Sequence, residues 1–117
     1  MSDVGYFGLG RTSNREWANG IASDSSGNVY VTGGTKGDLD GNTSAGDTDL
    51  FVVKYNSSGV KQWTQQLGTS SSEDGEGITS DSSGNVYVTG STSGGLDGDN
   101  YGTDIFIIKY YSNGNLQ

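Results

Sequence analysis

The sequence DSSGNVYVTG occurs twice in this chain, as Asp24–Gly33 and again, unchanged, as Asp81–Gly90. The two copies are 57 residues apart. Further along, Asp49–Gln62 (DLFVVKYNSSGVKQ) aligns with Asp104–Gln117 (DIFIIKYYSNGNLQ) at a spacing of 55 residues. Repeats of this length are typical of solenoids, propellers and other arrays. The repeat therefore decides the architecture, and the chain is best understood as two similar units.

The sequence of each unit predicts short β-strands joined by turns. In the repeated stretch, Val29 and Val31 alternate with Tyr30 and Thr32, which is the pattern of a strand with two different faces. The run DLFVVKY is nearly continuously apolar, which predicts a strand covered on both faces. The four strands expected in the first unit are Trp17–Ser23, Asn28–Thr32, Asp49–Tyr55 and Val60–Leu67. Their counterparts in the second unit are Gly77–Ser80, Asn85–Thr89 and Asp104–Tyr110.

Two kinds of connection separate these strands. Asp24–Asn28 and Asn56–Gly59 predict hairpins in which a type I turn is followed by a glycine in the left-handed conformation, which glycine adopts cheaply. Gly34–Thr48 and Gly68–Gly75 are longer, polar and rich in glycine or acidic residues. No stretch has helical periodicity with capping residues. The chain is therefore predicted to be all-β.

Four strands per unit, faces buried on both sides and a period above forty residues together predict the blades of a β-propeller. The first strand of a blade lies at the central axis and the fourth at the rim. Gly20–Ser23 and Gly77–Ser80 are small, as a crowded axis requires, whereas the strand around Trp63 is polar and aromatic, which suits the rim.

The ends of the chain predict an exchanged strand. The second unit stops at Gln117, before the place where a second Trp63 would stand, and the opening segment Val4–Leu9 resembles the Trp63–Leu67 strand, with Tyr6 near the tryptophan position. A rim strand supplied by another copy would leave no open sheet edge. We therefore expect one unit over residues 1–117, made of a rim strand at 4–9, blade one at 17–67 and blade two at 75–117.

Two blades cannot close a ring, because propellers have about four to eight blades. A lone pair would expose two broad faces that carry Val, Ile, Phe and Tyr, and such patches mark interfaces. We expect a cyclic homo-oligomer with head-to-tail contacts, in which two, three or four chains give about four, six or eight blades, the tetramer being favoured over the trimer. The alternative is that the chain supplies two blades of a longer propeller.

Composition excludes several functions. The chain has 14 acidic and 6 basic residues, so nucleic acid is not an expected partner, because phosphate contacts need lysine and arginine. The absence of cysteine and histidine excludes disulfides, thiolate metal sites and histidine-dependent triads. No apolar run is long enough to cross a membrane, so membrane insertion is not expected. The N-terminal sequence lacks a secretory signal, which indicates a cytoplasmic protein or a fragment of a longer precursor.

The long loops contain a candidate calcium site. Asp38, Asp40 and Asn42 stand at alternate positions, followed by Asp47, in the spacing with which calcium loops begin. The second loop offers Asp97 and Asp99. Neither loop has the bidentate acid at the twelfth position, so the EF-hand pattern fails, and aspartate, asparagine and glycine also simply form turns. No cofactor is required by the sequence, and calcium is the one that it would admit.

Other residues are open to two interpretations. Trp17 could stack on a sugar or pack on a neighbouring blade, and the second is the expected role because tryptophan buries a large area. Asp49 and Lys54 recur as Asp104 and Lys109, which indicates architecture, such as turn capping or ion pairing between blades. A glycosidase would pair carboxylates across a central pocket, but no acidic residue here is marked by an apolar surrounding.

The pattern GIxxDSSGNVYVTG, then LDG, D-aromatic-apolar-apolar-KYNxxG and WxxQLG, resembles the SBBP β-propeller repeat family. The resemblance covers nearly the whole chain in two copies. It implies a propeller fold, an adhesive or scaffolding setting in bacterial secreted or surface proteins, and no established catalytic residues. We therefore expect a non-enzymatic scaffold or interaction module. A calcium-dependent or carbohydrate-binding propeller is the alternative, and a glycosidase is the third possibility.

Overall fold

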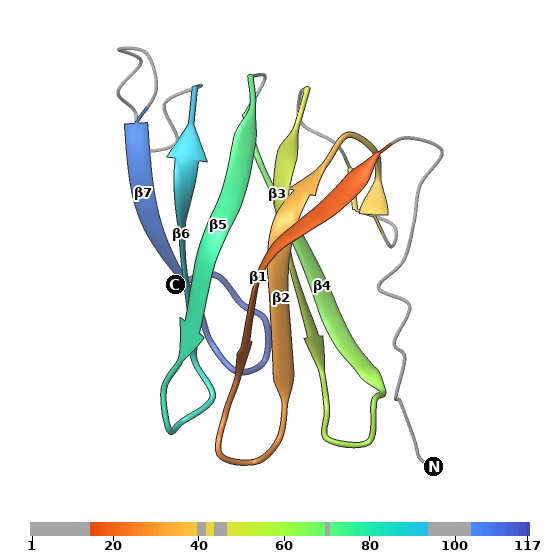
Figure 1. The fold of residues 1–117 in the computed structure, drawn as a ribbon, viewed down its shortest axis with the longest axis vertical. Coiled ribbons are helices and arrows are strands. Elements are labelled where there is room, and N and C mark those ends of the chain that lie inside the picture. The colour runs from red at the N-terminus through yellow and green to blue at the C-terminus, as the bar shows by residue number, and fades with distance from the viewer. Residues whose placement is uncertain (1–14, 40–41, 44–46, 70, 94–103) are drawn as a thin grey trace.

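A computed structural model of the chain describes residues 15–39, 42–43, 47–69, 71–93 and 104–117, which form two antiparallel sheets lying side by side (Figure 1). The first sheet has the order β1 (Glu16–Ser23), β2 (Val29–Thr35), β3 (Asp49–Tyr55) and β4 (Lys61–Leu67). The second has the order β5 (Glu73–Ser80), β6 (Val86–Thr92) and β7 (Asp104–Tyr110). The all-β prediction is confirmed. The predicted rim strand Val4–Leu9 lies outside the described residues.

The strand bounds follow the sequence prediction most closely where the apolar pattern is dense. β3 and β7 begin and end at the predicted residues. β5 begins at Glu73 instead of Gly77, because β6 continues as far as Thr92 and gives this acidic, glycine-containing segment a partner strand. Such a segment has no apolar alternation, so its strand character depends on pairing and not on its own sequence.

The tight turns have the predicted geometry. Gly27, Gly59, Gly84 and Gly114 all have positive φ angles, between 81° and 92°. Asp24 organises the first turn: its carboxylate accepts hydrogen bonds from the backbone N–H groups of Ser26 and Asn28 and from the hydroxyl of Tyr30. Burial raises the pKa of Asp24, but the hydrogen bonds outweigh this effect and lower that pKa to about 2. The turn is therefore built around an ionised carboxylate.

We call the first sheet blade one and the second sheet blade two. Side chains alternate from one side to the other along the strands, so each blade has two faces. We call the side that carries Tyr30 the front face and the side that carries Val31 the back face. In blade one the front face consists of Tyr30, Thr32, Leu50, Val52 and Lys54, and the back face of Val29, Val31, Phe51, Val53 and Tyr55. In blade two the front face consists of Tyr87, Thr89, Ile105, Ile107 and Lys109, and the back face of Val86, Val88, Phe106, Ile108 and Tyr110.

The main core lies between the blades, where the front face of blade one packs on the back face of blade two. Its buried members are Tyr30, Leu50, Val52, Val86, Val88 and Tyr110, with Trp63, Leu67, Ile78, Phe106 and Ile108 packed around them. The innermost strands β1 and β5 run next to each other at this interface (Figure 1). Burial raises the pKa of Tyr110 to about 12, as expected for a phenol inside an apolar core.

The expectation that both outward faces of the blade pair would be exposed holds for only one of them. On the front face of blade two that expectation is correct, because Ile105 and Ile107 are 86% and 77% exposed. On the back face of blade one it is wrong for the outer strands, where Val31, Phe51, Val53 and Tyr55 form a second buried cluster with Leu39. Only toward the inner strand is this face open, at Ile21, which is 71% exposed. The pair of blades thus has one outward face that is largely covered, on blade one, and one that is exposed, on blade two.

Blade two has three strands among the described residues, so the outer edge of β7 is its open edge. One antiparallel bridge joins Tyr110 to Leu116, and the N–H of Gln117 donates to the carbonyl of Lys109 at 2.9 Å. These residues repeat the start of β4, where Tyr55 pairs with Lys61. Beyond this point no described strand pairs with β7 on its outer side. No helix in the described part of the chain is long and apolar enough to span a bilayer.

Candidate functional site

The contacts between the two blades show what a blade of this chain binds. At the outer strands, side chains from blade one hydrogen-bond to backbone carbonyls in the turns of blade two. Lys54 Nζ and Trp63 Nε1 both donate to the carbonyl of Ser112, at 3.0 and 3.1 Å. The Tyr30 hydroxyl reaches the carbonyl of Gly84 at 3.4 Å. The Trp63 ring lies between Tyr30 and Tyr110, with ring centroids 6.5 and 5.9 Å apart.

At the inner strands the blades approach so closely that there is no room for a side chain on Gly75. A Cβ atom on Gly75 would overlap the Thr32 hydroxyl and lie 3.3 Å from the Cβ of Thr32. Asn19 Nδ2 donates to the Gly75 carbonyl at 2.9 Å and to Asp74 Oδ1 at 3.1 Å. The Ser80 hydroxyl donates to the carbonyl of Ser23 at 3.0 Å. A glycine and an amide donor therefore define the inner half of this interface.

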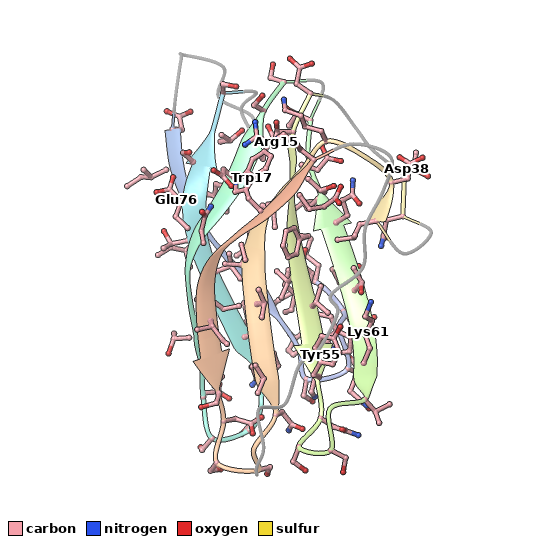
Figure 2. The ribbon with its side chains drawn as sticks, turned by 45° about the vertical axis from the view of Figure 1, so that its right-hand side comes forward. Arg15, Trp17, Asp38, Tyr55, Lys61 and Glu76 are labelled. Carbon is pink, nitrogen blue, oxygen red and sulfur yellow. The ribbon has the colours of Figure 1, made fainter. Side chains whose placement is uncertain are left out.

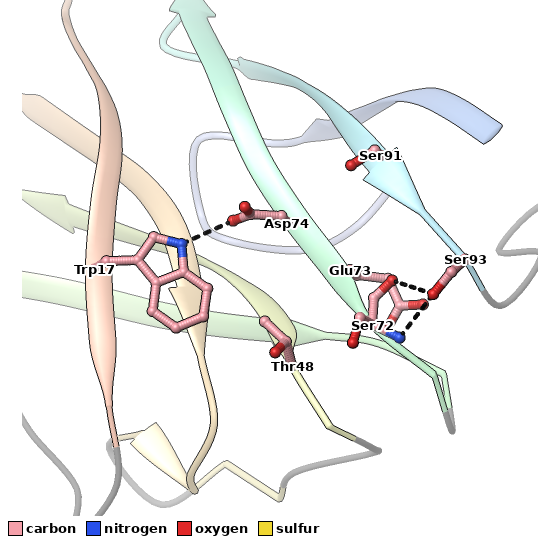
Figure 3. Close-up of a pocket in the computed structure, with 7 residues that line it drawn as sticks. All are labelled: Trp17, Thr48, Ser72, Glu73, Asp74, Ser91 and Ser93. Atoms are coloured by element: carbon pink, nitrogen blue, oxygen red, sulfur yellow. Dashed lines mark hydrogen bonds between the residues drawn. The ribbon is translucent and has the colours of Figure 1, made fainter. Parts of the chain in front are cut away.

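Trp17 joins the blades next to a pocket at one end of β1 and β5 (Figure 3). Its Nε1 donates to Asp74 Oδ1 at 3.2 Å, and the Arg15 guanidinium lies 5.7 Å from its ring centroid. Figure 2 shows Arg15 beside Trp17. The ring also lies against Gly34, where a side chain would not fit. Trp17 thus packs on Gly34 of its own blade, and its contact with the neighbouring blade is the hydrogen bond to Asp74.

The pocket itself has a volume of about 270 Å³ and is lined by Trp17, Thr48, Ser72, Glu73, Asp74, Ser91 and Ser93. Burial is the largest influence on Asp74 and raises its pKa; the hydrogen bond from Trp17 acts in the opposite direction, and the nearby carboxylate of Glu76 raises the pKa further. Glu73 is buried and accepts hydrogen bonds from Thr69 and Thr92. Both carboxylates are therefore held by neighbouring side chains that fix the pocket wall.

The front face of blade two carries two highly exposed isoleucines, Ile105 and Ile107. Ile105 and Ile107 stand in the positions that Leu50 and Val52 occupy in blade one, where both are fully buried. The Tyr87 hydroxyl donates to Asp81 at 2.9 Å, as Tyr30 does to Asp24. In both blades a lysine lies over this tyrosine ring, with Nζ 5.5 to 5.6 Å from the centroid. The face is therefore a second copy of a surface that binds a blade.

The open edge of β7 carries a buried acceptor. Asp104 begins β7, and its Oδ2 atom is buried with no hydrogen-bond partner among the described residues. The counterpart in blade one is Asp49, whose Oδ2 accepts a hydrogen bond from Gln66 Nε2 at 2.9 Å. Gln66 lies on the fourth strand. The edge of β7 therefore has the polar group, as well as the backbone, that a fourth strand would bind.

The candidate calcium ligands are only partly described. Asp40, Asp97 and Asp99 lie outside the described residues. Asp38 lies at the side of the molecule away from Glu76 (Figure 2). Asn42 uses its Nδ2 to donate to the carbonyls of Leu39 and Thr64, which anchors the loop on β4. Among the described residues, no group of three or more aspartate or glutamate side chains, Asp38 and Asp47 included, is close enough to hold a metal ion. Calcium binding stays a prediction.

Comparison with known proteins agrees with this geometry. The family model described as the SBBP β-propeller repeat matches residues 6–40 and 62–97, which together are more than half of the chain. The chain belongs to the SBBP β-propeller repeat family. An uncharacterised WD repeat-containing protein of Acanthamoeba polyphaga mimivirus is 35% identical over 80 residues, which cover 57% of this chain and 6% of that protein. The chain thus spans a small part of this relative.

Repetition within the chain explains which of the residues that join the blades the sequence could indicate. Lys54 was identified because it recurs as Lys109, and it does bind the neighbouring blade, at a carbonyl instead of a carboxylate. Asn19 and Gly75 could not be identified, because each differs from its counterpart in the other repeat, Glu76 and Ala18. The sequence does mark these two residues, because they differ between the two copies. A search for repeated residues does not detect such a difference.

Proposed function

We propose that this SBBP-repeat protein is a non-enzymatic β-propeller interaction scaffold whose two-blade chains assemble head-to-tail into a closed ring. The observation that carries the proposal is the exposure of Ile105 and Ile107 on the front face of blade two. Their counterparts, Leu50 and Val52, are fully buried against a back face of the same kind. A second copy of a surface that binds a blade within the chain is suited to bind another blade.

The polar contacts of the internal interface can also be repeated between chains. Lys109 would donate to the Ser57 carbonyl of a second copy as Lys54 does to that of Ser112. Tyr87 would face the carbonyl of Gly27 as Tyr30 faces that of Gly84. The turns that supply these carbonyls have the same left-handed glycines in both repeats. Head-to-tail contacts of this kind close into rings when the rotation per chain allows it.

A strand from the neighbouring chain would complete blade two. The outer edge of β7 and the buried Oδ2 of Asp104 offer the backbone and side-chain groups for a fourth strand. Val4–Leu9, the segment expected to supply it, is outside the described residues, so its role is part of the proposal. Covering an open edge in this way removes a site of unspecific aggregation.

One structural change has to accompany assembly. The outer part of the back face of blade one, including Val53 and Tyr55, is buried in the single chain. This face must be uncovered before another blade can pack on it, so assembly should be slow from the folded chain and faster during folding. The experiment therefore compares folded protein with protein refolded from denaturant at several concentrations.

The test measures mass in solution by light scattering or sedimentation. A chain of 12.2 kDa should give a mass of two to four chains, with four favoured over three, because these give about four to eight blades. Ile107→Asp should return the protein to a single chain, because a carboxylate would be buried in the interface. Val60→Asn gives this exposed apolar residue the identity of its counterpart Asn115, which is exposed in the internal interface, and is the matched control, which should still assemble. A wild-type chain that stays monomeric under every condition, or an Ile107→Asp protein that still forms rings, would overturn the proposal.

The non-enzymatic part of the proposal rests on the pocket carboxylates, since Glu73 and Asp74 accept hydrogen bonds from the protein itself. Hydrolysis of a polysaccharide panel that is lost in Asp74→Asn would contradict it. The calcium-dependent alternative is tested by thermal melts with calcium and with EDTA, in which equal melting temperatures would remove it.

A further inference from the structure

We infer that Ala18 and Glu76 weaken the contact between chains and thereby act as specificity-determining residues for assembly. This inference rests on the proposed head-to-tail ring. It concerns the inner strands, where the two repeats differ. Within the chain, the inner half of the interface is formed by Asn19 from blade one and Gly75 from blade two. Between chains, Glu76 and Ala18 would take these two positions.

The strand register establishes the correspondence. In blade one, Ala18 pairs with Gly33 just before an irregularity in the pairing of β1 with β2. In blade two, Gly75 pairs with Gly90 just before the same irregularity. Asn19 and Glu76 are the extra residues at these two irregularities. The four residues therefore form two matched pairs, although no similarity in their letters indicates it.

Ala18 introduces a steric conflict. The internal interface brings Thr32 onto Gly75 so closely that a Cβ there would overlap the threonine hydroxyl. Thr89 is the counterpart of Thr32 and is held in the same way, because each hydroxyl donates to a carbonyl of the neighbouring strand, at 2.9 and 2.8 Å. Rotating the hydroxyl away would break this hydrogen bond. It would also leave the two Cβ atoms 3.3 Å apart, so the strands of the two chains would have to separate slightly.

Glu76 removes a hydrogen bond. Asn19 donates its Nδ2 to the carbonyl of Gly75, and the corresponding contact between chains would place the Glu76 carboxylate against the carbonyl of Ala18. A carboxylate and a carbonyl are both acceptors, so no hydrogen bond forms and the two oxygens repel each other. Glu76 is exposed and already accepts a hydrogen bond from Ser91 of its own blade. Figure 2 shows it at the edge of the molecule, beyond Trp17.

These two differences leave the outer contacts as the main attraction between chains. The isoleucine face and Lys109 can repeat the internal interface, whereas the inner strands cannot. The consequence is that two blades of one chain bind each other more tightly than two chains do. The ring can then open and close while each pair of blades stays folded.

The test converts the contact between chains into a copy of the internal one. Ala18→Gly removes the obstructing Cβ and Glu76→Asn restores the amide donor. Each should tighten the dissociation constant of assembly about tenfold, and the double variant about a hundredfold, as measured by sedimentation equilibrium. Two matched controls should give no gain. Ala18→Ser keeps a Cβ, and Glu76→Asp has the size of asparagine but remains an acceptor.

Each result distinguishes this inference from the proposed ring. Unchanged assembly in the double variant, together with loss of assembly in Ile107→Asp, would overturn the inference and leave the ring in place. A monomeric wild type with an assembling double variant would support the inference and overturn the ring for the natural sequence. If neither protein assembles, both proposals are wrong. A gain in Ala18→Ser equal to that in Ala18→Gly would also refute the steric argument.

Discussion

β3 and β7 have nearly the same sequence and opposite surroundings. β3 is buried along its whole length except at Lys54, because a blade packs on its front face and a second cluster covers its back face. β7 has a back face on which Tyr110 is buried and Phe106 and Ile108 are half-buried, and a front face that exposes Ile105 and Ile107. An apolar strand in this protein is therefore not evidence of burial. Its position in the array of blades decides how much of it is covered.

The largest expected effect comes from truncating matched residues of these two strands. Leu50→Ala removes a side chain that is fully buried between the blades and should cost about 2–5 kcal/mol of unfolding free energy. Ile105→Ala, at the matching position, should change that free energy by less than about 0.5 kcal/mol in the single chain, because the side chain is 86% exposed. Urea unfolding at a concentration that keeps the protein monomeric measures both, and equal losses would contradict the comparison.

A smaller effect is expected at the inner strands. Gly75→Ala forces a Cβ into the space of Thr32 and should cost about 1–3 kcal/mol, as overpacked cores do. The control is Gly20→Ala at the neighbouring strand, where the added Cβ would lie 3.2 Å or more from its neighbours and a small shift relieves the contact. Thermal melting of both variants sharpens the comparison of the two repeats. A Gly75→Ala protein as stable as the wild type would contradict the assigned close approach.

The lysines should differ by less. Lys54→Met breaks the hydrogen bond to the Ser112 carbonyl and keeps the aliphatic chain, so a loss of about 0.5–1 kcal/mol is expected at this exposed site. Lys109→Met loses the matching contact with the Tyr87 ring but breaks no hydrogen bond to a neighbouring blade among the described residues, so it should cost less than Lys54→Met in the single chain. Chemical denaturation distinguishes them. Equal destabilisation would show that lysine stabilises its own blade and not the neighbouring one.

The smallest expected effect is a pH dependence at the turns. The pKa of Asp24 is about 2 in the folded chain, below the ordinary 3.8, so its ionised form stabilises the fold. This stabilisation is complete above pH 3.8 and is lost as the pH falls toward 2. Asp24→Asn should flatten the acid limb of a melting-temperature profile.

Asp81→Asn is the matched variant in blade two. Hydrogen bonding by Asn85 is the largest influence on Asp81 and lowers its pKa as well. Its tyrosine partner, Tyr87, lies on the exposed front face, whereas Tyr30, the partner of Asp24, is buried between the blades. The smaller change is therefore expected in Asp81→Asn. A larger change there would show that the turns, and not the blade interface, dominate the acid response.

Much of the fold could be predicted from local sequence. The repeated DSSGNVYVTG sets the turn and the second strand of each blade, because a left-handed glycine and alternating side chains are determined by neighbouring residues. The start of β5 at Glu73 could not be predicted, since its acidic residues become a strand only by pairing with β6. The apolar run of β3 correctly predicts a strand covered on both faces, whereas the similar run of β7 has an exposed front face, because burial depends on segments distant in the sequence.

The sequence by itself determined the two repeated sheets, the order of their strands and the membership in the SBBP family, all of which follow from repetition and short-range patterns. Only the tertiary structure decided which face of each blade is covered and which residues join the blades. Contacts such as those of Thr32 with Gly75 arise between strands that are far apart in the chain. Strands of similar sequence, such as β3 and β7, then differ in burial because each blade can cover only the face that its neighbour presents to it.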